Sequence, residues 1–524
     1  MTSPRRQDIL LTANNGSHIS GRPFKGSRPY GPLISRLFIG QGGSSRWSWW
    51  ALVVVVFISG CTVGPDYKRP ETAVPPDWGD MTGAGLTSTS EEIVQWWTLF
   101  QDETLNSLIE RAVGSNKDLK IAGARIREAR AQWRMAGAEL FPNLEAAGSY
   151  SHQRQSENAS SGGSGANFPG DQDLYQIGFD ASWEVDVFGG VRRGVEAAGA
   201  ELDAANELRR DVLVSLLSEV AANYLELRAS QRRITVLREN IKTQENTLEL
   251  LQGRFNAGLS GILEVTQAEA QLRNTESRLP AIEASVLMSI YRLGVLIGKE
   301  PEALLGELSV ERPIPPVPPQ VPVGLPSDLL RRRPDVRRAE RLLAAQTARI
   351  GVATADLFPR FYLTGIAGIK SLESSDLISR DSRFYSIGPS VNWPVFEGGR
   401  IRANIEVQNA RQEQALLTYE NAVLTSLEDV KNAIVAYSKE QATCRALGQA
   451  VESTRKATEI SSALYAQGLD DFLNVLVSQG ALHQVEDQYI QSEQMVSTAL
   501  VALFKALGGG WETTEKTGSG DGRS

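Results

Sequence analysis

The chain carries one set of motifs twice, in the same order and at nearly constant separation. Three pairs of segments match: 138–142 (AELFP) with 355–359 (ADLFP), 183–190 (WEVDVFGG) with 393–399 (WPVFEGG), and 254–259 (RFNAGL) with 464–469 (LYAQGL). A repeat of this kind indicates that one supersecondary unit has been duplicated. Each unit is predicted to contain a helix, two strands, a long helix and a returning helix, which gives a mixed α+β fold with an internal tandem duplication.

The motifs set the limits of the two units. The first unit covers 101–312, with strands expected near 144–151 and 174–188, a long helix to 257 and a return helix over 261–297. The second covers 327–511, with strands near 361–370 and 384–396, a long helix to 467 and a return helix over 470–507. Seven prolines fall within 313–326, which predicts a stiff extended linker. Residues 512–524 are predicted to be a disordered tail.

The long helix of the first unit shows a heptad repeat. No proline lies between Gly190 and Gly258, and an apolar side chain recurs at every seventh position: Leu213, Val220, Leu227, Ile234, Ile241, Leu248 and Phe255. This periodicity is typical of a coiled-coil seam. At 1.5 Å per residue, such a helix is roughly 100 Å long, which is more than a compact domain requires. The second unit has the same period at Val423, Val430, Tyr437, Cys444, Val451 and Tyr465, with Thr458 interrupting it.

The second strand of each unit has the pattern of a membrane barrel strand. From Tyr175 to Val187 apolar and polar residues alternate strictly, as expected when one face meets lipid and the other meets water. Hydrocarbon satisfies no backbone N–H or C=O group, so the four strands of one chain must close with strands from other copies. Two copies give about eight strands and three give about twelve, and the acidic side chains of the polar face favour the wider, water-filled ring.

The N-terminus has the features of a secretion signal followed by a lipid-anchor site. In the predicted signal region 1–60, an apolar stretch after Arg46 ends at ISGC, of which the cysteine is Cys61. This ending resembles a bacterial lipobox and implies an S-diacylglycerol and an N-acyl group on Cys61, at the start of a lipid-anchored segment 61–100. Thr62 replaces the aspartate of inner-membrane retention, which implies outer-membrane sorting. Residues 1–45 are long for a signal and indicate an overextended start.

Composition argues against several other classes of protein. The chain has 54 basic and 62 acidic residues and a net charge of −8, so no basic nucleic-acid-binding face is expected. With 3 His and 2 Cys there is little material for a metal cluster, and neither a phosphate-binding GxxxxGK[ST] loop nor a catalytic triad is visible. We expect no enzyme activity, no metal, no nucleic-acid partner and no cofactor other than the covalent lipid.

Motifs along nearly the whole mature chain resemble the outer-membrane factor family of TolC-like channels, in its lipoprotein branch of the NodT and OprM type. They are CTVGPDY at 61–67, the paired tryptophans at 96–97, RRPD at 332–335 and ALGGGW at 506–511. The resemblance implies a trimeric outer-membrane β-barrel of twelve strands, four per chain, continuous with a long α-helical coiled-coil tunnel in the periplasm. It also implies docking of this homotrimer to a periplasmic adaptor (a membrane fusion protein) and an inner-membrane RND-type pump.

The resemblance assigns the two helix turns to the periplasmic tips of the tunnel. Gly258 and Leu259 in the first unit, and Gly468 and Leu469 in the second, match the positions where the adaptor packs and the tunnel closes. Glycine suits such a turn because it adopts positive φ without strain.

Three further residues are candidates for the gate. Asp470 and Asp471, tripled by symmetry, would form an acidic ring that selects cations. The alternative is that they are two solvated carboxylates at the start of a helix. The constriction aspartate of the TolC branch falls one turn further on, where this chain has Asn474.

The predicted function is a passive outer-membrane exit channel for small molecules, such as drugs and toxic compounds, that an inner-membrane transporter expels. Export of proteins by a type I secretion system and export of metals are alternatives within the channel class. A coiled-coil structural lipoprotein without a pore is the alternative outside it, and it would need no amphipathic strands.

Overall fold

The computed structural model describes residues 62–78, 86–87, 94–154, 171–318 and 321–512. The predicted signal region 1–60, the predicted lipidation residue Cys61 and residues 513–524 of the predicted tail lie outside the described residues.

Each unit places helices before and after a pair of strands. The elements of the first unit are η1 (Trp96–Phe100), α2 (Glu103–Ser115), α3 (Lys117–Ala138), β2 (Asn143–Arg154), β3 (Asp171–Val185), α4 (Gly190–Asn256), α5 (Ile262–Glu276), α6 (Leu279–Leu296), η3 (Pro301–Leu304) and α7 (Leu305–Leu308). Those of the second are α8 (Pro326–Arg332), α9 (Pro334–Ala355), β5 (Arg360–Ser371), η4 (Ser374–Asp376), β6 (Arg383–Asn392), α10 (Arg400–Ala466) and α11 (Phe472–Ala506). Two short strands, β1 (Leu86–Thr87) and β4 (Val321–Pro322), pair in parallel.

Prolines account for two differences from the expected elements. The first return segment is two helices, because α5 ends at Glu276 and α6 begins at Leu279 with Pro280 in its first turn. Proline lacks the N–H that would continue the helical hydrogen bonds, and α11, which contains no proline, is unbroken over 35 residues. Strand β6 stops at Asn392, short of the expected 396, just before Pro394.

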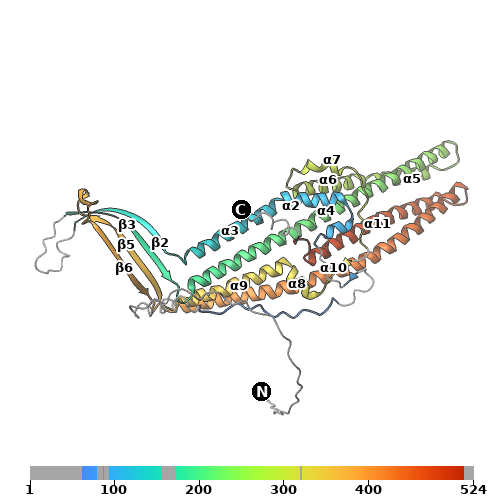
Figure 1. The fold of residues 1–524 in the computed structure, drawn as a ribbon. Coiled ribbons are helices and arrows are strands. Elements are labelled where there is room, and N and C mark those ends of the chain that lie inside the picture. The colour runs from blue at the N-terminus through green and yellow to red at the C-terminus, as the bar shows by residue number, and fades with distance from the viewer. Residues whose placement is uncertain (1–61, 79–85, 88–93, 155–170, 319–320, 513–524) are drawn as a thin grey trace, which may run out of the picture. The chain divides into compact units, whose positions relative to one another are not determined.

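The four long strands form one antiparallel sheet in the order β2-β3-β5-β6 (Figure 1). Directly opposite residues share a face of a sheet, and the register aligns the apolar residues of the four strands. One such row is Ala146, Phe179, Ala367 and Tyr385, and a row on the other face is Ser149, Gln176 and Lys370. Among the described strands, β2 pairs only with β3 and β6 only with β5, so the sheet has two open edges.

The long helices pack side by side in a definite order (Figure 1). Next to the strands the order of contacts is α3, α4, α9, α10. Towards the helix turns, α6 and α5 both contact α4, α4 contacts α11, and α11 contacts α10. At both levels of this helical layer, α10 lies at one edge and a first-unit helix, α3 or α6, lies at the other.

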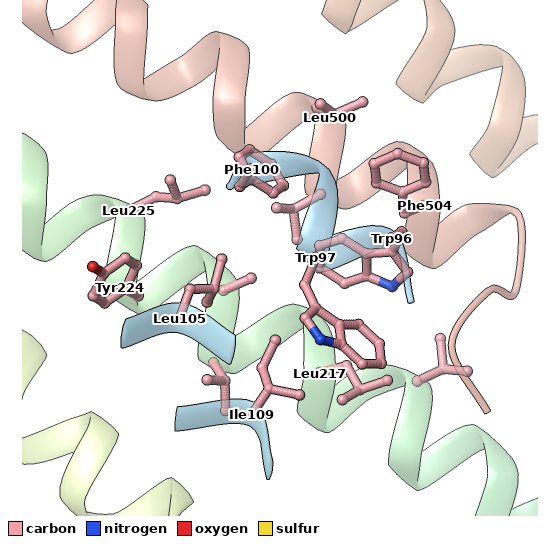
Figure 2. Packing of buried hydrophobic residues seen from close by; sticks show 14 of the residues in the cluster. Trp96, Trp97, Phe100, Leu105, Ile109, Leu217, Tyr224, Leu225, Leu500 and Phe504 are labelled. Carbon is pink, nitrogen blue, oxygen red and sulfur yellow. The ribbon is translucent and has the colours of Figure 1, made fainter. Parts of the chain in front are cut away.

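The predicted heptad seam of α4 is buried only where other elements surround it. Leu213, Val220 and Leu227 are at most 1% exposed, within a cluster that includes η1, α2 and the end of α11. Figure 2 shows this packing, in which the Trp96 ring stacks on Phe504 with centroids 5.2 Å apart. Phe255, the last seam residue, is 41% exposed.

The repeated motifs contact one another inside each unit. The Trp183 indole N–H donates to the Leu140 carbonyl at 3.0 Å, and the Trp393 indole donates to Leu357 at 3.1 Å. The LFP turn and the tryptophan therefore form one structural element that each unit repeats. Two motifs that are not repeated, RRPD at 332–335 and ALGGGW at 506–511, also contact each other. The Trp511 indole donates to the Arg332 carbonyl at 2.9 Å.

One helical stretch of the described chain, Ile262–Leu296, is long and apolar enough to cross a membrane on length and composition alone. It is interrupted between α5 and α6, and one face of it packs against α4. Its outward face carries Leu287, Met288 and Val295, which are 42%, 61% and 48% exposed. This exposed apolar face lies on the edge of the helical layer opposite α10.

Candidate functional site

The two helix turns have the same backbone geometry. Gly258 and Gly468 adopt φ of 74° and 72°. In each turn the glycine N–H donates to the carbonyl three residues back, and the leucine N–H donates to the carbonyl five residues back, with distances of 2.8–3.0 Å. This is the Schellman motif, which satisfies the last carbonyls of a helix and reverses the chain. The predicted tip residues are therefore equivalent positions of a duplicated turn.

Both turns expose apolar side chains. Leu259 and Leu469 are each 70% exposed. Ile262 and Leu263 follow in the first unit with 59% and 66%, and Val477 lies further along α11 with 62%. A group of exposed apolar residues at the ends of two helix pairs is typical of a surface that another protein covers.

The predicted gate carboxylates cap α11 in the single chain. Asp470 accepts hydrogen bonds through Oδ1 from the Asp471 N–H at 2.8 Å and from the Asn474 amide at 2.7 Å. Asp471 is the N-cap and accepts from the Leu473 N–H at 3.4 Å. The structure thus brings the three predicted residues together, and the capping alternative describes what they do within one chain. Their role as a gate stays a prediction.

A hydrogen bond that the sequence did not predict joins the two units at the tips. The Tyr465 hydroxyl on α10 donates to Glu264 Oε2 on α5 at 2.7 Å. The Arg254 guanidinium on α4 lies 5.0 Å from the centre of the Tyr465 ring, within cation–π range. We call Arg254, Glu264 and Tyr465 the tip bridge. Beneath it, Leu251 and Phe472 are buried at 0% and 1% exposure.

The environment of the tip bridge keeps the tyrosine protonated. Burial, and then the hydrogen bond and negative charge of Glu264, raise the pKa of Tyr465 from 10.0 to about 12. Because the pKa is raised in the folded protein, this contribution to stability is complete below pH 10 and is lost as the pH rises through about 12. The bridge donor is therefore present at every physiological pH.

A sequence signal for the bridge existed in the repeat itself. Tyr465 aligns with Phe255 between the two copies of the turn motif. A tyrosine that replaces a phenylalanine on a helix seam brings a hydroxyl group that needs a partner when it is buried. Nothing in the local sequence identifies Glu264 as that partner, because the two residues are 201 positions apart.

A second candidate site lies where the described chain begins. The Val63 N–H donates to the Phe188 carbonyl at 3.0 Å, just after β3. The Arg193 guanidinium donates to the Val63 carbonyl at 3.2 Å and pairs with Asp66 at 2.6 Å. Thr62 packs so closely that a Cβ at Gly189 would lie 2.7 Å from its side chain. The residue next to the predicted lipidation position is therefore fixed beside the end of β3.

Comparison with known proteins agrees with this geometry. The family described as "Outer membrane efflux protein" matches residues 108–299 and 325–509, one segment in each unit. Nodulation protein T of Rhizobium leguminosarum bv. trifolii is 31% identical over 478 residues, which are 88% of this chain and 97% of that protein. The pyoverdine export outer membrane protein OpmQ of Pseudomonas aeruginosa is 33% identical, with coverage of 87% and 96%.

Solved structures share the fold. The outer-membrane channel OprN superposes with a TM-score of 0.81 at 35% identity, covering 86% of this chain and 100% of that one. The family match includes both units and most of the chain, so the resemblance predicted from the motifs is confirmed. The chain belongs to the outer membrane efflux protein family.

Proposed function

We propose that three copies of this chain form the exit duct of a tripartite efflux pump in the bacterial outer membrane. The observation that carries the proposal is a four-stranded sheet with one apolar face and two open edges. This sheet leads directly into helices that end in two exposed turns. A duct needs both parts, whereas a coiled-coil tether would need only the helices.

The open edges of the sheet support closure by other copies. In lipid, the unpaired N–H and C=O groups of β2 and β6 would have no partner, so each edge must pair. Four antiparallel strands per chain allow the β6 edge of one copy to continue into the β2 edge of the next. Three copies close a ring of about twelve strands, wide enough for an aqueous lumen lined by the polar face of the sheet.

The helical layer supports the same arrangement. Its two edges are α10 on one side and α3 with α6 on the other. The outward residues Leu287, Met288 and Val295 of α6, and Leu417 and Leu424 of α10, are all more than 40% exposed in the single chain. Joining α10 of one copy to α3 and α6 of the next would cover both edges. The membrane-like hydropathy of Ile262–Leu296 then belongs to a subunit interface.

The partners follow from the family and the exposed tips. Relatives are named as outer membrane proteins of efflux pumps and of pyoverdine export, which supports a small-molecule cargo. The exposed leucines at both turns offer the surface for a periplasmic adaptor, through which an inner-membrane RND-type pump would deliver the cargo. Type I protein secretion has no specific observation in its favour.

The test of this function combines assembly with transport. Mass measurement in mild detergent should give three chains per particle, and deletion of the gene should raise the retention of a fluorescent pump substrate in cells. A stable monomer with all four strands embedded in the membrane would contradict the proposal. So would a trimer whose loss leaves substrate retention unchanged.

We propose a lipid anchor on Cys61, supported by the fixed position of the adjoining Thr62 and Val63 beside β3. The variant Cys61→Ser should lose the incorporation of labelled palmitate, and its mass should lack acyl chains, because no thiol remains for the diacylglycerol. A Cys444→Ser variant, which changes the one free cysteine of the described chain, should keep its label. Label retained by Cys61→Ser would refute the site.

We also propose that Asp470 and Asp471 form the acidic ring at the tip. Replacing both with Asn should lower cation preference in planar-bilayer recordings, most visibly at low ionic strength, because salt screens their field. Asparagine also caps helix N-termini well, so assembly should persist. Unchanged ion selectivity across a salt series would leave the two residues as caps only.

A further inference from the structure

Six exposed charges on α3 and α10 form two matching series. Lys120, Arg127 and Arg134 recur every seventh residue on α3, and Glu406, Glu413 and Glu420 do so on α10. All six side chains are exposed, and within the described part of the chain none of them forms an ion pair or a side-chain hydrogen bond. The two helices occupy opposite edges of the helical layer, so these charges cannot pair within one chain.

The two series fit each other in an antiparallel register. Helix α3 leads up to β2 and α10 leads away from β6, so the two run in opposite directions relative to the sheet. Arg134 then faces Glu406, Arg127 faces Glu413 and Lys120 faces Glu420, each pair one heptad from the last. An α-helix places such residues on one stripe.

The same register also aligns the exposed apolar residues. Ala124, Ala131 and Ala138 recur every seven residues on α3, and Ala403, Ala410 and Leu417 do so on α10, all of them exposed. With Arg127 opposite Glu413, the position opposite each alanine of α3 is one residue away from one of these residues of α10. On both helices the charged stripe lies beside the apolar stripe. Small apolar residues flanked by opposite charges are typical of a closely packed helix pair.

The internal duplication provides an independent check of this register. Within one chain, α4 packs against α9, which is the equivalent of α10 packing against α3 of the next copy. The repeat motifs equate Lys120 with Arg337 and Glu420 with Arg210. Arg210 and Arg337 do meet, because they bind the same Glu207 oxygen at 2.5 and 2.7 Å and both stack on the Trp511 ring. The internal interface therefore has the register that the charge series predicts for the external one.

We infer that Lys120, Arg127 and Arg134 of one copy form a charge ladder with Glu420, Glu413 and Glu406 of the next copy, and that this ladder sets which chain binds and in which register. The inference rests on the three-copy ring proposed above. Exposed ion pairs contribute little affinity, but like charges placed opposite one another reject a wrong neighbour. The ladder thus selects a second copy of this chain over related ducts and over a shifted register.

Charge reversal tests the ladder. The variant Glu406→Lys/Glu413→Lys/Glu420→Lys places three basic residues opposite the three basic residues of the next copy. On a semi-native gel, most of this variant should therefore run as a monomer, whereas the wild type runs as a trimer. Adding Lys120→Glu/Arg127→Glu/Arg134→Glu should restore the trimer with reversed polarity. Co-expressed with tagged wild type, this six-residue variant should form separate trimers, because mixed interfaces bring like charges together.

Cross-linking tests the register without altering the rest of the ladder. In a Cys444→Ser background, Arg127→Cys/Glu413→Cys should be linked between chains by a short bis-maleimide and yield covalent dimers and trimers. The matched control, Arg127→Cys/Glu406→Cys, is one heptad out of register and should not be linked.

The outcomes separate this inference from the function on which it rests. A wild type that is not trimeric overturns the three-copy duct itself. A trimeric wild type whose triple reversal stays trimeric, or whose control pair links as well as Arg127→Cys/Glu413→Cys, overturns the ladder and leaves the duct standing. Loss of adaptor binding with an intact trimer would assign the charges to the adaptor and would also overturn the ladder.

Discussion

Gly368→Ala is expected to prevent formation of the proposed barrel. Gly368 on β5 lies directly opposite Gly178 on β3. A Cβ at Gly368 would be 2.3 Å from the Ile177 carbonyl oxygen and 2.7 Å from the Gly178 Cα, which are backbone atoms that cannot rotate away. The two strands would have to separate, and overpacking of this kind typically costs about 1–3 kcal/mol. We expect loss of the heat-sensitive trimer band on a semi-native gel.

A control for this effect lies on the same strand. A Cβ at Gly365 would have its nearest contact at 3.8 Å, an ordinary van der Waals distance, so Gly365→Ala should insert and assemble normally. Both variants lose the same conformational freedom of glycine, so the difference between them isolates the close approach of β3 and β5. Normal assembly of Gly368→Ala would show that the sheet relaxes at this point.

In the proposed three-copy duct, Tyr465→Phe is expected to favour opening at the helix turns. The change keeps the ring, which lies 5.5 Å from Phe472, and removes only the hydroxyl that binds Glu264. A hydrogen bond to a charged, partly exposed carboxylate contributes about 1 kcal/mol. Three copies opening together would lose roughly 3 kcal/mol, or about a hundredfold in the ratio of closed to open ducts. Single-channel recordings in planar bilayers should show a large gain in open time.

Two further variants decide whether the bridge causes this effect. Glu264→Gln removes the charge of the acceptor and should also increase open time. Tyr489→Phe is the matched control, since the Tyr489 hydroxyl interacts with Glu493 on the same helix and does not join the two units. Equal effects of Tyr465→Phe and Tyr489→Phe would contradict a bridge between the units.

The sequence predicts the residues of the two helix turns, but it does not predict the hydrogen bond that joins the two units beside them. The turn glycines follow from a duplicated motif, because positive φ between two helices strongly favours glycine. Asp470, Asp471 and Asn474 were expected near the tip, and the structure places all three at the start of α11. The tip bridge was not expected, because its hydrogen bond joins residues from the two different units.

The rest of the fold also separates into features that local sequence patterns predict and features that depend on long-range contacts. The amino-acid sequence by itself determined the duplication, the alternating strands and the two long helices, because each has a short period that shows in neighbouring residues. Only the tertiary structure decided the strand order and the partners of Trp183, Trp511 and Tyr465. The burial of Leu213 and the exposure of Phe255 on one seam were also decided there, because they depend on which elements surround each turn of α4. Side chains hundreds of residues apart meet only after the helices have packed, and no local period encodes that meeting.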